Sequence, residues 1–492
     1  MLLNIDFSEK KYYYAIFAIM VFKNKGYIDG AFKSAHNWLF YKDKKRVVKS
    51  FIFNLVLNIP YYRRQLDSEV FKIDEQLQSS MKQLEDGIPR IKALPQKGLT
   101  KNLIEENMQL MRKIDEKHGN LNKLSGTLYN TPLKEELELQ KQVMNFYYKT
   151  NPLHADIYPS LVTMEKDIVS ITKKLLNCPD YEGVGTVTTG GTESIILALF
   201  GYREWGRKKG IVNPEVIAPK TVHPAFDKGC YYLGIKLNKI EVDQNNKLDI
   251  SSLKWHINHN TILIVGSAPS FPHGLMDDIN LLSKVALRYN LPLHVDACLG
   301  GFVLAFLNRG HEFDFSIKGV TSMSIDTHKY GCCPKGSSVL VFREPSMFEC
   351  CYFIQSEWCG GIYATTNMTG SRSGLTLAWT WSMLNFQGYS KLNLQANKIR
   401  DHVEKIKDAF KDDSDLFIFG DPNVCVVGFG SNTINIYDLS QKMKHLGWNL
   451  NELQNPASFH LCITNCHTDE IIGEFIENIR SSLNIIISEN LN

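Results

Sequence analysis

Short apolar runs alternate with amphipathic stretches through the middle of the chain, a pattern typical of strands followed by helices. One helix is predicted over Asp277 to Tyr289, where Leu281, Leu282, Val285 and Tyr289 share a face. Four apolar runs are predicted strands: Glu215 to Pro219, Thr261 to Pro269, Pro292 to Ala297 and Ser337 to Arg343. This alternation predicts an α/β fold with a mostly parallel sheet, which binds ligands at the carboxyl ends of its strands.

The pattern changes after about Tyr389 to that of a smaller α+β domain. A predicted helix from Asp401 brings Val403, Ile406 and Phe410 together, and Asp469 to Leu483 repeats the spacing. We therefore expect an N-terminal helical region over 51–160, a large domain over 161–388 and a small C-terminal domain over 389–492.

The first 50 residues have a different character. Tyr12 to Phe22 is an apolar run of 11 residues, shorter than the roughly 20 that a transmembrane helix needs. Basic residues follow, including the stretch Lys42 to Lys49, which would keep the remainder of the chain in the cytosol if the run inserts. Residues 1–50 are thus either a short membrane anchor or an interfacial or packing segment.

Composition is that of a large soluble enzyme. The chain has 492 residues, of which 44% are hydrophobic and 22% charged, and its net charge of +3 gives no support for a nucleic-acid partner. Eleven cysteines, an odd number in mostly apolar contexts, favour a reducing cytosolic environment over a disulfide framework. The run HLCITNCH contains His460, Cys462, Cys466 and His467, but its spacing is that of a strand, and we expect no metal.

Two short motifs carry the candidate chemistry. HVDACLGG contains Asp296, and SIDTHKYG contains Lys329, 33 residues later and directly after His328. A lysine amine can bond covalently to an aldehyde cofactor once burial or nearby positive charge lowers its pKa. A carboxylate can keep a pyridine nitrogen protonated, so the pair is what a pyridoxal 5'-phosphate (PLP) enzyme requires.

A glycine turn and a histidine upstream complete this set. GVGTVTTGGTES predicts a strand, a tight turn at Gly190 and Gly191, and the start of a helix. Backbone amides of Gly191, Thr192 and Glu193 are candidates for holding the cofactor phosphate, because helix N-termini bind anions. His223 follows a predicted strand and is suited to stack on the pyridine ring.

The ordered motifs resemble those of the sphingosine-1-phosphate lyase family over about residues 50 to 485. They include NPLHADIYPS, TTGGTES, HPAF, SAPSFPHG, HVDACLGGF, SIDTHKYG, PKGSS, GGIYA and GSRSG. The resemblance implies PLP-dependent fold type I, a homodimer, and retro-aldol cleavage of phosphorylated sphingoid bases to a long-chain aldehyde and phosphoethanolamine. It also implies an N-terminal anchor in the endoplasmic reticulum membrane, as in eukaryotic members.

The same resemblance assigns roles to single residues. Lys335, Ser371 and His154 match the groups that bind the substrate phosphate, and His328 matches a contact of the cofactor phosphate. Positions near the reacting centre are matched by Tyr129 and Asn151. Tyr129, Lys329 and the substrate phosphate are all candidate proton carriers. This chain departs from the family pattern at Cys332, Cys333 and Ser373, which bears on the shape of the pocket.

Two other functions remain open from the sequence. An amino-acid decarboxylase shares the aspartate and the His-Lys pair but has no need of Lys335, Ser371 and His154. A membrane-associated scaffold could keep the fold without turnover. Retention of Asp296, Lys329 and His223 together speaks against the scaffold.

Overall fold

The computed structural model describes residues 87–491, except 119, 180–182, 244, 245, 247 and 308–311. It also describes the single positions 68, 71, 75, 79 and 82. The apolar run Tyr12 to Phe22 lies outside the described residues. Within the described part, no helix is long and apolar enough to cross a membrane. The chain divides into two compact units, Met1–Ile114 and Asp115–Asn492, and every candidate site residue belongs to the second.

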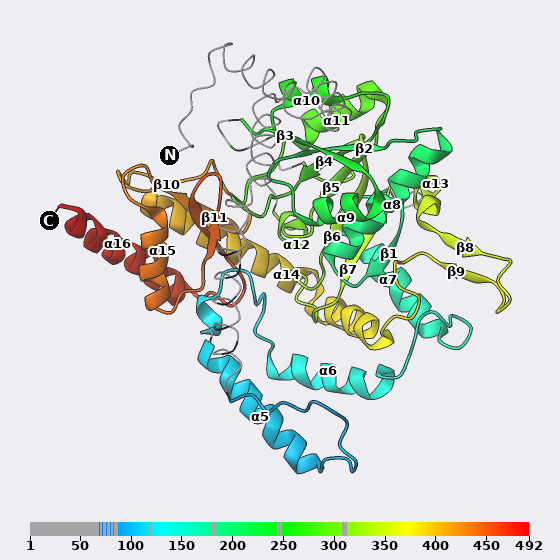
Figure 1. Cartoon of the computed structure of the whole chain (residues 1–492), viewed down its shortest axis with the longest axis horizontal. Helices are drawn as coiled ribbons and strands as arrows, with labels where there is room; N and C mark the ends of the chain where they lie inside the picture. The colour runs from blue at the N-terminus through cyan, green and yellow to red at the C-terminus, as the bar shows by residue number, and fades with distance from the viewer. Residues whose placement is uncertain are drawn as a thin grey trace. The chain divides into compact units, whose positions relative to one another are not determined.

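A seven-stranded sheet is the centre of the second unit (Figure 1). The strands lie in the order β1-β7-β6-β5-β4-β2-β3, and β7 runs antiparallel to both of its neighbours, whereas all other pairs are parallel. Their bounds are β1 Val184–Thr188, β2 Glu215–Pro219, β3 Lys236–Ile240, β4 Thr261–Ser267, β5 Leu293–Asp296, β6 Val320–Ile325 and β7 Ser338–Phe342. The predicted mostly parallel sheet is therefore confirmed.

Both faces of this sheet are covered, because alternate strand residues enter two different apolar cores. Val216 and Ala218 pack with α8 and α9, whereas Ile217 between them packs in the core that holds α7 and α11. The helices of this unit are η1 Leu121–Lys123, α6 Lys134–Tyr147, α7 Pro159–Leu175, α8 Gly191–Lys208, α9 Ala225–Leu233, α10 Ile250–His256, α11 Ile279–Tyr289, α12 Gly301–Leu304, α13 Pro345–Phe348 and η2 Glu349–Cys351. Before them comes α5, Lys101–His118.

The apolar face predicted for α11 is partly wrong. Leu282 and Val285 are buried, but Leu281 and Tyr289 are both 40% exposed. The buried stripe begins at Ile279 and continues through Leu282 and Val285 to Ala286. Leu281 lies one position away from this stripe and therefore faces outward.

A second, antiparallel sheet of four strands forms the C-terminal part, in the order β10-β11-β13-β12 (orange in Figure 1). The elements are α14 Gly374–Phe410, β10 Phe417–Ile418, β11 Val426–Gly430, α15 Ile436–His445, β12 Asn451–Leu453, β13 Ser458–Cys462 and α16 Asp469–Leu491. A small hairpin of β8 Phe353–Gln355 and β9 Tyr363–Thr365 precedes them. Val403, Ile406 and Phe410 are buried together, as their spacing predicts.

Candidate active site

Several strands of the large sheet end around one cavity of about 420 Å³. Asp296 is the last residue of β5, Asp326 follows β6, and the turn after β1 leads into α8 at Gly191. The cavity is lined by seven of the residues that the sequence predicts for the site: Tyr129, Gly191, Thr192, His223, Asp296, His328 and Lys329. The fold therefore brings together groups that are up to 200 positions apart in the sequence.

Lys329 forms an ion pair with a residue that the sequence reasoning missed. Its Nζ lies 2.9 Å from Oδ2 of Asp326, three positions earlier. Burial alone would lower the pKa of the Lys329 ammonium, but the Asp326 charge outweighs burial and raises it. The expectation that this pKa is lowered is thus wrong for the chain without cofactor, and the lysine is held as a cation.

Asp296 accepts two hydrogen bonds, and both reach the same oxygen. Oδ1 receives the backbone N–H of Cys298 at 3.1 Å and the hydroxyl of Ser324 at 3.3 Å. Among the described residues, Oδ2 has no hydrogen-bonded partner. One oxygen is therefore fixed by the protein, and the other is available to a group in the cavity.

The start of α8 leaves room for an anion. Gly190 has a φ of 153°, and no side chain caps the first turn. A Cβ at Gly191 would lie 2.8 Å from both Oδ1 of Asp326 and Sγ of Cys298, so only glycine fits there. Glu193 accepts the N–H of Thr189, just before the helix, at 2.7 Å. The amides at this terminus suit a phosphate.

Two histidines line the cavity. His223 accepts a hydrogen bond from the N–H of Ala225 at its Nδ1, at 3.1 Å, which fixes the ring just beyond β2. His328 likewise accepts the N–H of Ser337 at Nδ1, at 3.1 Å, and its Nε2 lies 3.6 Å from Asp326. Burial lowers the pKa of His328 despite this carboxylate.

Tyr129 lines the cavity, and Lys335 lies beside Tyr129 without being among the residues that line the cavity in the described part of the chain. The Tyr129 ring meets Tyr330 edge to face, with centroids 5.0 Å apart, and the Nζ of Lys335 lies 4.5 Å from the Tyr129 centroid. Burial raises the pKa of the Tyr129 phenol well above its usual range, and the neighbouring thiol of Cys462 acts in the same direction. Burial lowers the pKa of Lys335, and the charge of Lys329 lowers it further.

Asn151, His154 and Ser371 are not among the residues that line this cavity in the described part of one chain. Asn151 donates a hydrogen bond from Nδ2 to the Ser371 hydroxyl at 3.1 Å, and its Oδ1 accepts the N–H of Arg372 at 3.2 Å. His154 is exposed in the turn that follows Asn151. The sequence predicted one site, but in a single chain these three residues lie outside the cavity that Lys329 lines.

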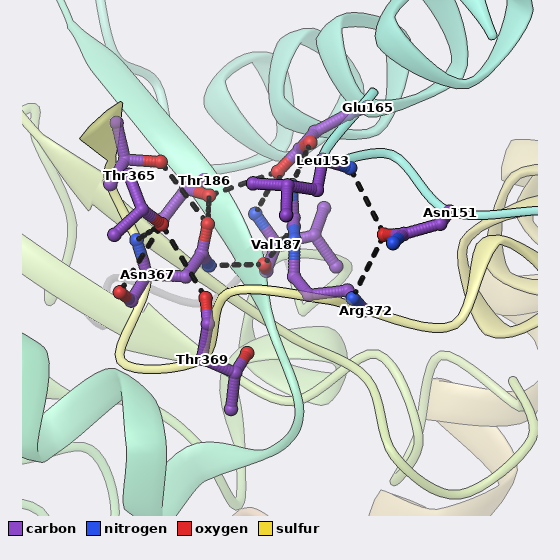
Figure 2. A network of polar contacts seen from close by, with 10 residues as sticks. Asn151, Leu153, Glu165, Thr186, Val187, Thr365, Asn367, Thr369 and Arg372 are labelled. Carbon is purple, nitrogen blue, oxygen red and sulfur yellow. Dashed lines mark hydrogen bonds and ion pairs between the residues drawn. The ribbon is translucent and has the colours of Figure 1, made fainter. Parts of the chain in front are cut away.

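The Asn151 group is anchored by a half-buried ion pair (Figure 2). Arg372 places both terminal nitrogens on Glu165, at 3.0 and 2.8 Å, and Nη1 also donates to the carbonyl of Val187 at 2.9 Å. The Arg372 guanidinium helps to hold the pKa of Glu165 below its usual range, against burial, which raises it. This pair fixes the loop that carries Ser371 to strand β1.

Asp326 could have been found from the sequence. It belongs to SIDTHKYG, and the reasoning that placed Asp296 at a strand end applies equally to Asp326 after β6. Cys298 gave no comparable signal, because its contact with Asp296 is made by the backbone.

These residues suit PLP. Lys329 offers an amine and Asp296 an available carboxylate oxygen, while the α8 terminus provides a cradle that a Cβ at Gly191 would fill. When bound, PLP supplies a ring that withdraws electrons from a breaking bond on the substrate. The protein itself orients the ring and carries protons.

Comparisons with known proteins agree with this arrangement. The pyridoxal-dependent decarboxylase conserved domain matches residues 147–431. Among solved structures, a glutamate decarboxylase of Lactobacillus brevis is similar with a TM-score of 0.71, covering 82% of this chain and 96% of its own. Its sequence identity is 21%, so this likeness shows the fold alone.

Two lyases are more similar in sequence. The sphingosine-1-phosphate lyase of Drosophila melanogaster is 40% identical over 443 residues, which is 87% of this chain and 80% of the fly protein. The solved sphingosine-1-phosphate lyase of Burkholderia pseudomallei is 30% identical, with a TM-score of 0.79, and the match covers 83% of this chain and 96% of that one. The chain is thus a PLP-dependent enzyme of fold type I and belongs to the sphingosine-1-phosphate lyase family.

Proposed function

We propose that this chain cleaves phosphorylated sphingoid bases between C2 and C3, releasing a long-chain aldehyde and phosphoethanolamine. The observation that carries the proposal is the place of Lys335. It adds a second cation beside the cavity that holds Lys329 and Asp296, with its ammonium over the Tyr129 ring. A substrate that carries its own phosphate needs such a cation, whereas an amino-acid decarboxylase needs a site for a carboxylate and not the set Lys335, Ser371 and His154.

The residues divide the work of the reaction. Lys329 holds the cofactor, and Asp296 keeps the pyridine nitrogen protonated. With PLP bound, His223 would lie against the ring, and the amides of Gly191 and Thr192, with His328, would hold the cofactor phosphate. The proton of the substrate hydroxyl passes to Lys329 or to the substrate phosphate. Because burial disfavours an ionised Tyr129, we assign this phenol the role of a donor rather than a resting base.

The test of this function is a cleavage assay with the purified PLP-loaded protein. Sphingosine 1-phosphate should give aldehyde and phosphoethanolamine in equal amounts, and unphosphorylated sphingosine should react far more slowly. Release of CO₂ from glutamate or an aromatic amino acid, without cleavage of the lipid, would favour the decarboxylase. A protein that binds PLP and turns over none of these substrates would favour the scaffold.

Lys335→Ala tests recognition of the phosphate. Loss of a charge-assisted contact worth roughly 1.5 to 3 kcal/mol should lower kcat/KM for the phosphorylated substrate by about 10- to 150-fold. Activity on the unphosphorylated base should hardly change, so discrimination between the two falls. Lys411, whose side chain is 64% exposed on α14, provides the control variant Lys411→Ala. Equal discrimination in the wild type and Lys335→Ala would place the phosphate elsewhere.

The functional unit that we propose is a homodimer with shared sites. Asn151, His154 and Ser371 would then act on the substrate phosphate in the cavity of the partner subunit. Support comes from their position outside the Lys329 cavity of their own chain. It also comes from the attachment of the loop that carries Ser371 to β1 through Arg372 and Glu165.

Co-expression of two inactive variants tests this arrangement. Lys329→Ala and a Ser371→Ala, His154→Ala double variant damage different halves of the proposed site. Random pairing makes half of the dimers mixed, and each mixed dimer keeps one intact site, so about a quarter of wild-type activity should return. A mixture no more active than its components would mean that each chain uses its own residues.

For the cell, we propose a cytosolic catalytic part attached to the endoplasmic reticulum membrane by residues 1–50. The support is the apolar run Tyr12 to Phe22 with its basic flank. A fluorescent fusion of residues 1–50 should collect at that membrane and resist extraction by high salt. Release by salt would indicate an interfacial segment, and a diffuse signal would indicate a packing role.

A further inference from the structure

A continuous chain of hydrogen bonds runs from helix α8 to Asp296. The phenol of Tyr202 lies 2.6 Å from Oγ of Ser322, which lies 2.8 Å from Nδ1 of His294. On the other side of the imidazole, Nε2 lies 3.2 Å from Oγ of Ser324, and Ser324 reaches Oδ1 of Asp296 at 3.3 Å. Tyr202, Ser322, His294 and Ser324 are fully buried.

Counting protons fixes the direction of this chain. Burial lowers the pKa of His294 to about 4, so the ring is neutral and carries one N–H. Ser324 has a single proton, which goes to the Asp296 carboxylate, because an anion is a better acceptor than the nearby Cys298 thiol. Ser324 must therefore accept from Nε2 of His294, which leaves Nδ1 to accept from Ser322.

Every donor in the chain then points toward Asp296. Tyr202 donates to Ser322, Ser322 to His294, and His294 through Ser324 to the carboxylate. Hydrogen bonds aligned in one direction polarise one another and strengthen the last contact. That contact falls on Oδ1 beside the Cys298 N–H, so the carboxylate is fixed with Oδ2 available to the cavity.

We propose that His294 is a positioning residue: as a neutral imidazole protonated on Nε2, it fixes Asp296 through Ser324 as the acceptor for the pyridine nitrogen. The inference rests on the role proposed for Asp296. His294 touches neither substrate nor cofactor and acts only through Ser324. A protonated His294 would carry a second N–H, on Nδ1, and could no longer accept the hydrogen bond from Ser322. The chain of donors would then be interrupted at Ser322, so the role requires a neutral ring.

Variants of the PLP-loaded enzyme test this role. Ser324→Ala removes the last donor to Oδ1, and His294→Phe removes the imidazole while keeping a ring of similar size. Both should raise the dissociation constant of PLP and lower kcat by about tenfold or more, with KM changed less than about twofold. His294→Gln can still donate to Ser324 and should recover most of both losses.

A matched control separates positioning from stability. Ser458 is also fully buried on a strand and donates one hydrogen bond, to the carbonyl of Pro456 at 2.9 Å, in the four-stranded sheet. Ser458→Ala should lower the unfolding temperature about as much as Ser324→Ala does, with PLP affinity and kcat unchanged. If Ser324→Ala behaves like Ser458→Ala in all three measurements, the inference is wrong.

Two further measurements keep the outcome unambiguous. Asp296→Asn tests the role of Asp296 itself: if it leaves PLP affinity and kcat unchanged, the proposed site fails, whereas an effect there without one in Ser324→Ala defeats only the role of His294. Nitrogen-15 spectra of the wild-type protein with labelled histidine report the tautomer without any variant at the chain. A proton on Nδ1 of His294 would overturn the inference, and one on Nε2 is expected.

Discussion

Asp326 decides the charge of Lys329 before the cofactor arrives. Its carboxylate lies 2.9 Å from the ammonium and raises the pKa of Lys329 against the effect of burial. Only the neutral amine attacks an aldehyde, so this pair delays covalent attachment until a higher pH.

Asp326→Asn should shift the pH dependence of attachment. Without the carboxylate, burial dominates and the pKa of Lys329 falls, so the neutral amine is present at lower pH. The pH midpoint for appearance of the visible band, when PLP is added to the cofactor-free chain, should move down by at least about one unit. Asp314→Asn, at another buried aspartate outside the cavity, is the control. An unchanged midpoint would mean that Asp326 does not govern the amine.

Single residues show how far the sequence reaches into the site. Lys329, Asp296 and His223 could be predicted because each stands in a motif whose residue types the chemistry requires. His294 and Ser324 could not, although both belong to those same motifs. Their importance depends on β5 lying beside β6, which brings His294 to Ser324. The hydrophobic periodicity of a short segment does not predict the order of strands in a sheet.

Strand β1 lies at the edge of the large sheet, and side chains take the place of a further strand. The N–H of Val187 donates to Glu165 at 2.9 Å, and its carbonyl accepts from Arg372 and from Asn367, each at 2.9 Å. These contacts satisfy backbone groups that an edge strand otherwise leaves unpaired (Figure 2). They also fix the strand that leads directly into the Gly190 turn.

Arg372→Lys should weaken this edge although it keeps the charge. A lysine has one donor nitrogen in place of the two that Arg372 directs at Glu165 and Val187, so it cannot reproduce this geometry, and the free energy of unfolding should fall by about 1 to 3 kcal/mol. Urea denaturation of the cofactor-free chain measures this loss. Lys141→Ala removes an exposed ion pair with Glu138 and should cost less than about 0.5 kcal/mol. Equal losses of unfolding free energy in the two variants would show that the paired Arg372 contacts do not stabilise strand β1.

Helix α14 shows where prediction at the level of elements stops. Periodicity predicts its second half, from Asp401, where one face is apolar. The first half, from Gly374, was not predicted, because it packs against α6, α7 and α12 and has apolar residues on several faces. The two halves meet at Gly388, whose φ of 62° and ψ of 172° interrupt the helix beside the predicted domain boundary.

For the whole molecule, the sequence predicts the α/β class and the approximate bounds of four strands of the large sheet, β2, β4, β5 and β7, because alternating apolar runs are local features. It does not predict that Asn151 and Ser371 lie apart from the Lys329 cavity, since the order of motifs along the chain does not say which of them the fold brings together. The domain boundaries at 50, 160 and 388 stay predictions.

The stability of the whole molecule should depend on buried neutral histidines. Burial lowers the pKa of four of them to about 4: His273, His294, His460 and His467. A folded-state pKa below the unfolded value of about 6.5 means that, as the pH falls, protons bind the unfolded chain first. The stability that these residues contribute is therefore complete above about pH 6.5 and is lost progressively toward pH 4, by at most roughly 3 kcal/mol each.

Urea denaturation of the cofactor-free chain at pH 8, 6.5, 5.5 and 4.5 measures this loss. His460→Asn keeps a donor for the carbonyl of Pro272, which Nδ1 of His460 contacts at 2.8 Å, but removes the titrating ring. Its stability should fall less steeply with pH than that of the wild type, whereas His445→Asn, at an exposed position on α15, should leave the slope as it is. If the free energy of unfolding of His460→Asn falls with pH as steeply as that of the wild type, the His460 imidazole takes up no proton on unfolding. Carboxylates, and not this buried ring, would then destabilise the fold in acid.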